Sequence, residues 1–441
     1  MEDLPTHLVI DILSRLDDSA DIARCRVASK TLNSLSREVR SINLRCSFDR
    51  YAKSRSPLTR SSITPFKTIF RNLISELGII ESVSIGVEKP LHTVAYDDVE
   101  DEDDLFLTDD KFAVEWLPKI GNGLISCSIS DFWVQSCWRR SDVLSLLSSY
   151  CQNLIELQIK NAWLSVDGLN PMPMLSKLTL EYIRLDDEDL DMVNKCLSSL
   201  QVLNLIGVGG LKEPRIHMSG LKTCHWTVSN AVTSINIVAP RLVKLKLKCA
   251  RPKALVIDTP SLTDLYLSLE EASKFKVHDF TSLKTLHLES FDLYRVICKL
   301  PFGPTIQNLK LSSTRTIGLM VATYGFKLLF SVFPNISSLT LNPRAWSELE
   351  MCEDLEVQNQ MKGLKDITAY LEIHDFDTTL LFIFFILDNC PNLTDAKLFI
   401  HRDVVFTVTN TLISRCMTHC PRVRWRWGMW KVGTEDAWMP T

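Results

Sequence analysis

Four residues near the C-terminus have side chains of the kinds that can bind zinc. Cys416, His419 and Cys420 lie close together, and His401 precedes them; thiolate and imidazole groups are the usual ligands of Zn²⁺. Their spacing contains no C-x-x-C pair of the kind that structural zinc sites use. Cys420 also matches Cys151 and Cys390, each of which directly precedes an apolar strand pattern. We therefore interpret the cysteines as buried core residues and predict no metal site.

Two other patterns offer groups that bind ligands. The acidic run "DDVEDEDD" at 97–104 has the carboxylates of a calcium loop but lacks its central glycine and terminal glutamate. It is more typical of a solvated insertion. The tail "WRWGMWK" carries Trp425, Trp427 and Trp430, whose alternation is typical of a strand. We predict a last strand there, within a cap that shields the end of the fold.

Catalytic motifs are not found in the sequence. It contains no G-x-x-x-x-G-K-[ST], G-x-S-x-G, H-E-x-x-H or G-x-G-x-x-G pattern. The chain has only 15 glycines, which supplies few loops able to enclose a phosphate. We therefore expect no enzymatic activity and no cofactor.

The composition is that of a folded protein rather than a disordered one. Of 441 residues, 46% are hydrophobic and 23% are charged. The net charge of −4 gives no overall attraction to nucleic acid or to an anionic membrane. The longest apolar run, Leu380 to Leu387, is far shorter than the roughly 20 residues of a membrane helix. We expect a buried helix there, and neither a nucleic acid nor a membrane as partner.

The cysteines and the N-terminal residues indicate a reducing compartment. The 13 cysteines form no compact framework, and Glu2 and Asp3 stand where a secretory signal would be basic. We expect free thiols and a location in the nucleus, the cytoplasm or both.

A repeated frame, L-x-x-L-x-L, organises most of the chain. Clear copies are "PRLVKLKL", "PSLTDLYL", "TSLKTLHL" and "PNISSLTL", and from Leu154 on the frame recurs at intervals of 20 to 30 residues, the period of leucine-rich repeats; weaker copies begin at Ile80 and Leu124. The first residues of the repeats are Ile80, Leu124, Leu154, Leu175, Leu200, Leu221, Leu242, Leu262, Leu283, Ile306, Ile336, Leu364 and Leu393.

Strand geometry explains this frame. Side chains alternate across a strand, so the two leucines of L-x-L point to one face and the residue between them points to the other. One strand cannot bury its leucines alone, but stacked copies form a continuous core. Intervals of 20–21 residues between 221 and 283 leave little room for a return helix. Longer intervals after 306 allow helices on the convex side, which we expect at 324–333 and 380–389.

The first 44 residues have a different, helical pattern. Leu8 and Ile12 form one apolar stripe, and Val9, Leu13 and Leu16 form a second stripe beside it. Two more short helices follow, one after the turn at 17–19 and one capped by Ser29, with apolar residues Ile22, Cys25, Val27, Leu32, Leu35 and Val39. Three short helices bury little surface, so such a unit needs a neighbour. The basic, serine-rich residues that follow indicate a linker or irregular connection, placed at 45–79.

The N-terminal motifs resemble an F-box. "LPTHLVIDILSRL" followed by "CRVASKTLNSL", joined to degenerate leucine-rich repeats, is similar to the plant F-box/LRR-repeat proteins. The family often has tryptophan at the position that Leu32 occupies here. The resemblance implies an α/β fold in which a three-helix F-box at 1–44 precedes a curved leucine-rich-repeat solenoid at 80–441. Its parallel strands would lie on the concave face, with a C-terminal cap.

The function that this resemblance implies is that of a non-catalytic substrate receptor in an SCF-type ubiquitin ligase. The F-box would bind an SKP-type adaptor, which links it to cullin and RING subunits, and the repeats would bind an unknown target protein. One stripe of the first helix would close the unit and the other would enter the adaptor's groove. The expected adaptor contacts are Leu4, Pro5, Leu8, Ile12, Leu16 and Val27.

The residues between the leucines would line the target-binding face. Lys244, Lys246 and Lys248 would form a short basic row that suits an acidic or phosphorylated target. The other expected contacts on the following strands are Tyr266, His287, Glu289 and Lys310. The alternative function is that of a repeat scaffold with no ligase role, whose N-terminal helices only cap the solenoid.

Overall fold

The computed structural model describes residues 4–16, 18–54, 64–88, 102–132, 139–270, 274–277, 280–315, 325–352 and 361–439. The chain forms two compact units, Met1–Asn230 and Ala231–Thr441, which are called unit 1 and unit 2.

Unit 1 begins with helices and continues with strands that alternate with helices. Its α-helices are α1 (Thr6–Ser14), α2 (Ser19–Ala28), α3 (Lys30–Leu35), α4 (Phe48–Ser54), α5 (Phe66–Glu76), α6 (Glu102–Leu105), α7 (Asp110–Ile120), α8 (Val143–Tyr150) and α9 (Asp187–Cys196). The 3₁₀ turns of its described residues are η1 (Ser36–Glu38) and η5 (Gly121–Gly123). Its strands are β1 (Ser41–Ser47), β2 (Ser82–Glu88), β3 (Ser126–Ser130), β4 (Arg140–Ser141), β5 (Glu156–Leu164), β6 (Lys177–Arg184), β7 (Val202–Val208), β8 (Arg215–His217) and β9 (Thr223–Val228).

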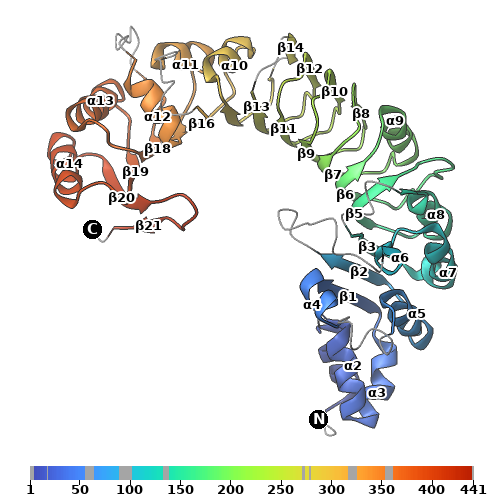
Figure 1. The fold of residues 1–441 in the computed structure, drawn as a ribbon. Coiled ribbons are helices and arrows are strands. Elements are labelled where there is room, and N and C mark those ends of the chain that lie inside the picture. The colour runs from blue at the N-terminus through green and yellow to red at the C-terminus, as the bar shows by residue number, and fades with distance from the viewer. Residues whose placement is uncertain are drawn as a thin grey trace. The chain divides into compact units, whose positions relative to one another are not determined.

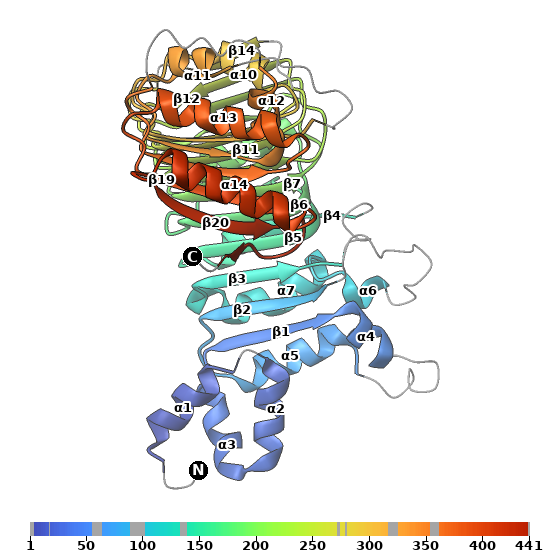
Figure 2. The ribbon, with the colours of Figure 1, turned by 90° about the vertical axis from the view of Figure 1, so that its left-hand side faces the viewer.

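The main sheet of unit 1 is parallel and follows the chain. Its strand order is β1-β2-β3-β5-β6-β7-β9, and β4 adds a short parallel pairing to β5. Figure 2 shows α1, α2 and α3 at the β1 edge of this sheet, next to α5. The N-terminal helices are therefore continuous with the repeats of unit 1.

Unit 2 begins with strands, and helices alternate with its strands only in the C-terminal part of the unit. Its strands are β10 (Ser234–Val238), β11 (Lys244–Cys249), β12 (Ala254–Asp258), β13 (Asp264–Leu269), β14 (Lys274–Val277), β15 (Thr285–Ser290), β16 (Asn308–Ser313), β17 (Ser338–Leu341), β18 (Asp366–Leu371), β19 (Asp395–His401), β20 (Arg424–Trp430) and β21 (Ala437–Trp438). Its helices are α10 (Leu293–Lys299), α11 (Phe326–Val332), α12 (Pro343–Glu350), α13 (Phe376–Asn389) and α14 (Phe406–His419).

The main sheet of unit 2 lies on the inner side of an arc. Its parallel order is β11-β13-β15-β16-β17-β18-β19-β20, and β21 pairs antiparallel with β20. Helices α10, α11, α13 and α14 lie on the outer side (Figure 1). The expected fold class, parallel repeat strands on a concave face behind N-terminal helices, is confirmed.

The leucine frame forms the core of both units. Leu283, Leu286 and Leu288 are fully buried, and the equivalent residues of the other repeats are at most 3% exposed. The in-register pairs of neighbouring strands place equivalent leucines side by side, as in Leu265–Leu286 and Leu286–Leu309. This stacking is what makes the repeats stable together when a single one would not be.

The outer side of unit 2 agrees with the expectation that short repeat intervals leave little room for a return helix. Where the repeat interval is short, the return segments are strands, and β10, β12 and β14 form a second parallel sheet. Their apolar residues alternate, as in Ile235 and Ile237 of β10 and Leu255 and Ile257 of β12. A period of two predicts a half-buried strand, so the sequence held this signal. The expected helices at 324–333 and 380–389 correspond to α11 and α13.

The interval 45–79 is not the irregular linker that the sequence suggested. Strand β1 continues to Ser47, α4 follows it, and α5 occupies Phe66–Glu76. Val39 and Ile42 are buried in the repeat frame, and β1 pairs with β2 along its whole length. The first repeat strand therefore begins within the segment assigned to the F-box and ends within the segment assigned to the linker, and α5 covers it.

The acidic run has a structural role at its described end. Asp104 accepts hydrogen bonds from the backbone N–H groups of Phe66, at 2.8 Å, and Lys67, at 3.0 Å. It thereby caps α5, whose own N-cap residue, Pro65, makes no side-chain hydrogen bond. Asp103 forms an ion pair with Arg139 at 2.7 Å. Residues 97–101 of the run lie outside the described part of the chain.

The cysteines that precede strands occupy one repeated position. Cys151, Cys390 and Cys420 are buried, and each is the C-cap of a helix. The backbone N–H of each cysteine donates a hydrogen bond to a carbonyl of the last turn of that helix. Burial raises the pKa of Cys151 and Cys390 to about 12. Among the residues described, no group of three or more His, Cys, Asp or Glu side chains is placed to bind a metal.

The aromatic tail and the longest apolar run form the expected elements. Trp427 and Trp430 are buried in β20, the last strand of the parallel sheet. The apolar run lies in α13, where Leu380, Phe382 and Ile383 are buried. In the ranges that the structure describes, no helix has the length and apolar character to cross a membrane.

Candidate functional site

Helix α1 has one buried and one exposed apolar face. Val9 and Leu13 are 4% and 2% exposed, whereas Leu8 and Ile12 are 42% and 43% exposed. Leu4, just before the helix, is 42% exposed. The exposed residues follow one another at intervals of four, which places them along one side of the helix. They are called the α1 stripe.

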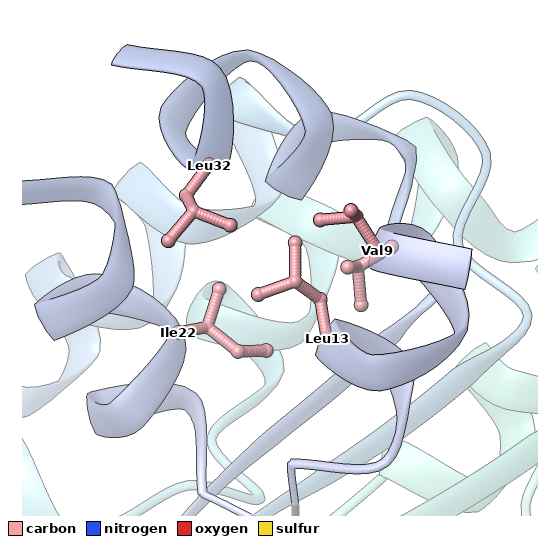
Figure 3. Close-up of a cluster of buried hydrophobic side chains, with 5 residues drawn as sticks. Val9, Leu13, Ile22 and Leu32 are labelled. Atoms are coloured by element: carbon pink, nitrogen blue, oxygen red, sulfur yellow. The ribbon is translucent and has the colours of Figure 1, made fainter. Parts of the chain in front are cut away.

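The buried face of α1 closes the three-helix unit. Its core contains Val9, Leu13, Ile22, Leu32 and Val39, and Figure 3 shows Val9 and Leu13 pointing toward Ile22 and Leu32. Leu32 occupies the position where the F-box pattern often has tryptophan, and here it is a core residue rather than a surface anchor.

The predicted adaptor contacts divide between these faces. Leu4, Pro5, Leu8 and Ile12 are exposed on or beside α1, and Val27 of α2 is 91% exposed. Leu16 is half-buried and packs against the core cluster. The structure therefore places Leu16 with the residues that hold the unit together, because it shares the face of Leu13.

A second candidate surface lies on the inner side of unit 2. The predicted residues Lys246, Tyr266, His287 and Lys310 stand in register on β11, β13, β15 and β16. Each occupies the centre of an L-x-L triplet, so it points away from the leucine core. Lys246 and Lys310 are exposed, while Tyr266 and His287 are half-buried.

A polar network connects these strands. Tyr266 donates to Glu289 Oε2 at 2.6 Å, and Ser268 donates to Glu289 Oε1 at 3.0 Å. Lys248 Nζ lies 3.7 Å from the same carboxylate. Burial opposes ionisation of Glu289, but these two hydrogen bonds and the charge of Lys248 together lower its pKa. Glu289 is thus an internal counter-ion of this face.

The two rings at the centre of this surface are neutral near pH 7. Burial, followed by the charge of Lys310, lowers the pKa of His287 to about 4. Burial and the hydrogen bond to Glu289 raise the pKa of Tyr266 to about 12. The rings contact edge to face at 4.5 Å, and His287 Nε2 lies 3.0 Å from Ser312 Oγ. Lys246 Nζ lies 5.4 Å from the centre of the Tyr266 ring.

Lys244 stands apart from this network. It is exposed at the start of β11, in register with Asp264. The three lysines of β11 therefore have different surroundings: a facing carboxylate for Lys244, an aromatic ring for Lys246, and Glu289 for Lys248.

Comparison with known proteins identifies a full-length relative in Arabidopsis thaliana, named F-box/LRR-repeat protein At4g29420. The two sequences are 52% identical over 453 aligned residues, and the alignment covers 100% of both chains. The chain belongs to the F-box/LRR-repeat proteins. No protein-family model matches it.

Within this F-box/LRR-repeat protein, Arg26 joins the N-terminal helices to the first repeat. Its Nε donates to Ser36 Oγ at 2.8 Å, and its guanidinium forms an ion pair with Glu76 at the end of α5. The hydroxyl of Ser19 on α2 accepts a hydrogen bond from the N–H of Asn43 on β1 at 2.9 Å. The F-box helices are thus supported by the repeats, while the α1 stripe stays exposed.

Sequence analysis missed part of the repeat face of this F-box/LRR-repeat protein. The row through Lys246 continues over Thr340, Thr368, Lys397 and Arg426 on β17 to β20. The signal was available, because each residue is the centre of an apolar triplet: Leu339–Leu341, Ile367–Ala369, Ala396–Leu398 and Trp425–Trp427.

Proposed function

We propose that this F-box/LRR-repeat protein is a substrate-recognition subunit of an SCF-type ubiquitin ligase. The α1 stripe would bind an SKP-type adaptor and, through it, cullin and RING subunits. The inner face of the repeats would bind the target protein. The chain itself would contribute binding only, and the transfer of ubiquitin would be carried out by its partners.

The observation that carries this proposal is the exposed apolar stripe of α1. The F-box helices already have a closed core and a neighbour in the first repeat, so Leu4, Leu8 and Ile12 are not needed to stabilise them. Apolar side chains at intervals of four on a helix suit a hydrophobic groove on a partner. Val27, the most exposed apolar residue of α2, would extend this surface.

The proposed target surface is the inner face of unit 2. Lys244, Lys246, Lys248, Tyr266, His287, Glu289 and Lys310 would contribute to it. The ordered network between Tyr266, Glu289 and Lys248 would fix side-chain positions before a target binds, which lowers the entropy lost on binding.

The proposal is tested by capture of a purified SKP-type adaptor. Leu8→Asp combined with Ile12→Asp is expected to abolish binding, because it places two charges in an apolar contact. Phe302→Asp combined with Leu381→Asp is the matched control, since both residues are exposed apolar residues of unit 2. This control is expected to bind the adaptor as the wild type does. Circular dichroism checks that both variants fold.

A repeat scaffold without a ligase role is the second candidate. The close packing of α2 and η1 on α5 through Arg26 favours it, because helices that only cap a solenoid would pack in the same way. No capture of the adaptor by the wild-type chain would support the scaffold and contradict the ligase proposal.

A further inference from the structure

One row of side chains crosses the whole parallel sheet of unit 2. Its members stand in register on successive strands and are called the central row: Lys246, Tyr266, His287, Lys310, Thr340, Thr368, Lys397 and Arg426. Each is half-buried or exposed, and each lies between two residues of the apolar core.

The central row carries four cations and no carboxylate. Within the described ranges, Lys246, Lys310, Lys397 and Arg426 form no ion pair; Lys246 only contacts the ring of Tyr266. In the adjacent rows, Lys248 is paired with Glu289 and Arg424 with Asp395, the latter through a hydrogen bond of 2.6 Å. Lys244 stands in register with Asp264, so most of the unpaired positive charge lies in the central row.

The residues between the cations add hydrogen-bonding groups without charge. His287 and Tyr266 are neutral near pH 7, and Thr340 and Thr368 present hydroxyl groups. Their side chains are half-buried, so they form a shallow floor between Lys310 and the cations on either side. An extended peptide bound along the central row would contact a cation, then a polar segment, and then another cation.

The spacing of the cations fits one type of ligand. Neighbouring strands lie about 4.8 Å apart, so Lys246 to Lys310, and Lys310 to Lys397, each span about 14 Å. An extended peptide rises about 3.3 Å per residue, so each span corresponds to roughly four residues. Residues four apart in an extended peptide point to the same side.

We propose that the central row binds an extended anionic peptide segment whose acidic residues recur at every fourth position. This inference rests on the proposed role of the chain as a substrate receptor, and it states what part of a target the repeats recognise. Carboxylates and phosphates on the peptide would pair with the same cations.

The charges around the central row disfavour nucleic acid as the ligand. Asp264, Glu289, Asp366 and Asp395 lie in the adjacent rows, where they would face the phosphates of a wide polyanion. Nucleic-acid sites use broad basic surfaces with many phosphate contacts. A single peptide strand is narrow enough to contact the cations alone.

The test measures binding of labelled peptides to the full-length chain by fluorescence anisotropy at low salt. One peptide has aspartate at positions 1, 5 and 9, the spacing of about four residues that strand geometry gives. A second has phosphoserine at these positions, and a third has the same composition as the first with its aspartates adjacent. A single-stranded oligonucleotide is the fourth probe. The variants are Lys310→Gln with Lys397→Gln, and the matched control Lys299→Gln with Lys327→Gln on the outer helices α10 and α11.

The expected result is that the spaced peptides bind at least threefold more tightly than the peptide with adjacent aspartates. Lys310→Gln with Lys397→Gln should weaken this binding about three- to tenfold, and the control variant should not. The ratio between the aspartate and phosphoserine peptides shows which anion is preferred. Equal binding of spaced and adjacent acids, tighter binding of the oligonucleotide, or no peptide binding at all would overturn the inference. Capture of the SKP-type adaptor by the same preparations tests the ligase proposal separately.

Discussion

The N-terminal helices and the repeat strands of unit 2 differ in how far they bury their apolar residues. The strands bury their leucines almost completely and present lysine, tyrosine, histidine and threonine to solvent. Helix α1 buries Val9 and Leu13 but leaves Leu4, Leu8 and Ile12 exposed. The difference leaves two surfaces of different chemistry exposed; we propose the apolar one for a constant partner and the charged one for selection among targets.

The largest expected effect separates the two faces of α1. Leu13→Ala should destabilise the three-helix unit by about 2–5 kcal/mol, because it opens a cavity in a core with few residues. Leu8→Ala should change stability by less than about 1 kcal/mol, because its side chain is exposed. Native-state hydrogen exchange of the amides in α1 to α3 measures both. Similar losses for the two variants would mean that the two faces are not distinct.

The attachment of the F-box to the first repeat should contribute less. Arg26→Met keeps much of the side-chain volume but removes the contacts with Ser36 and Glu76, and it should destabilise the three helices by about 1 kcal/mol. Arg24→Met is the matched control, since the exposed pair of Arg24 with Asp21 is worth only about 0.3 kcal/mol. The stability of the three helices in the two variants is compared by thermal unfolding, with limited proteolysis of the N-terminal segment as the readout. If the control had the larger effect, Arg26 would not be the attachment that the structure indicates.

The stability of α5 should depend on its cap, Asp104, which is distant in sequence. Asp104→Ala removes the acceptor for two N–H groups of α5 and for the Tyr51 hydroxyl, and it should cost about 1 kcal/mol. Asp103→Ala, which breaks only an ion pair on a nearly fully exposed side chain, should have little effect. Urea denaturation of both variants gives the comparison, and equal midpoints would show that Asp104 does not cap α5 in solution.

The last expected effect concerns pH and the repeat face. The pKa of His287 falls from 6.5 to about 4 in the folded chain, so the unfolded chain binds the proton first as the pH decreases. This contribution to stability is complete above pH 6.5 and is lost as the pH falls toward 4. The groups that face His287 are Tyr266, Glu289, Ser312, Lys246 and Lys310. His287→Gln should therefore lose less stability than the wild type between neutral and mildly acidic pH, as measured by urea midpoints. A larger loss in the variant would contradict this assignment.

Much of the fold could be predicted because the repeat signal is local. The positions of the leucines in L-x-x-L-x-L determine which residues are buried, and the residue between them must then face solvent. This placed Lys246, Tyr266, His287 and Lys310 on one surface. Helical spacing, independently of the repeats, placed Leu8 and Ile12 on a different side of α1 from Val9 and Leu13.

The parts that could not be predicted depend on contacts between distant residues. Asp104 caps a helix that begins 38 residues earlier, and no local sequence pattern predicts such a long-range contact. The frame at Val39 and Ile42 was hidden because the spacing of Leu32, Leu35 and Val39 is also helical, although the third helix ends at Leu35 and the first repeat strand begins at Ser41. The counter-ion role of Glu289 depends on strand register, which brings it next to Lys248 and Tyr266.

The central claim is that the F-box keeps an apolar surface exposed for a partner, whereas the repeats bury their apolar residues in their own core. Hydrogen–deuterium exchange of the wild-type chain, alone and saturated with a purified SKP-type adaptor, tests this claim directly. The account predicts new protection in the segment from Leu4 to Leu16 and around Val27, and no change in the strands of unit 2. Unchanged exchange in these N-terminal segments, with protection on the repeat strands instead, would contradict it.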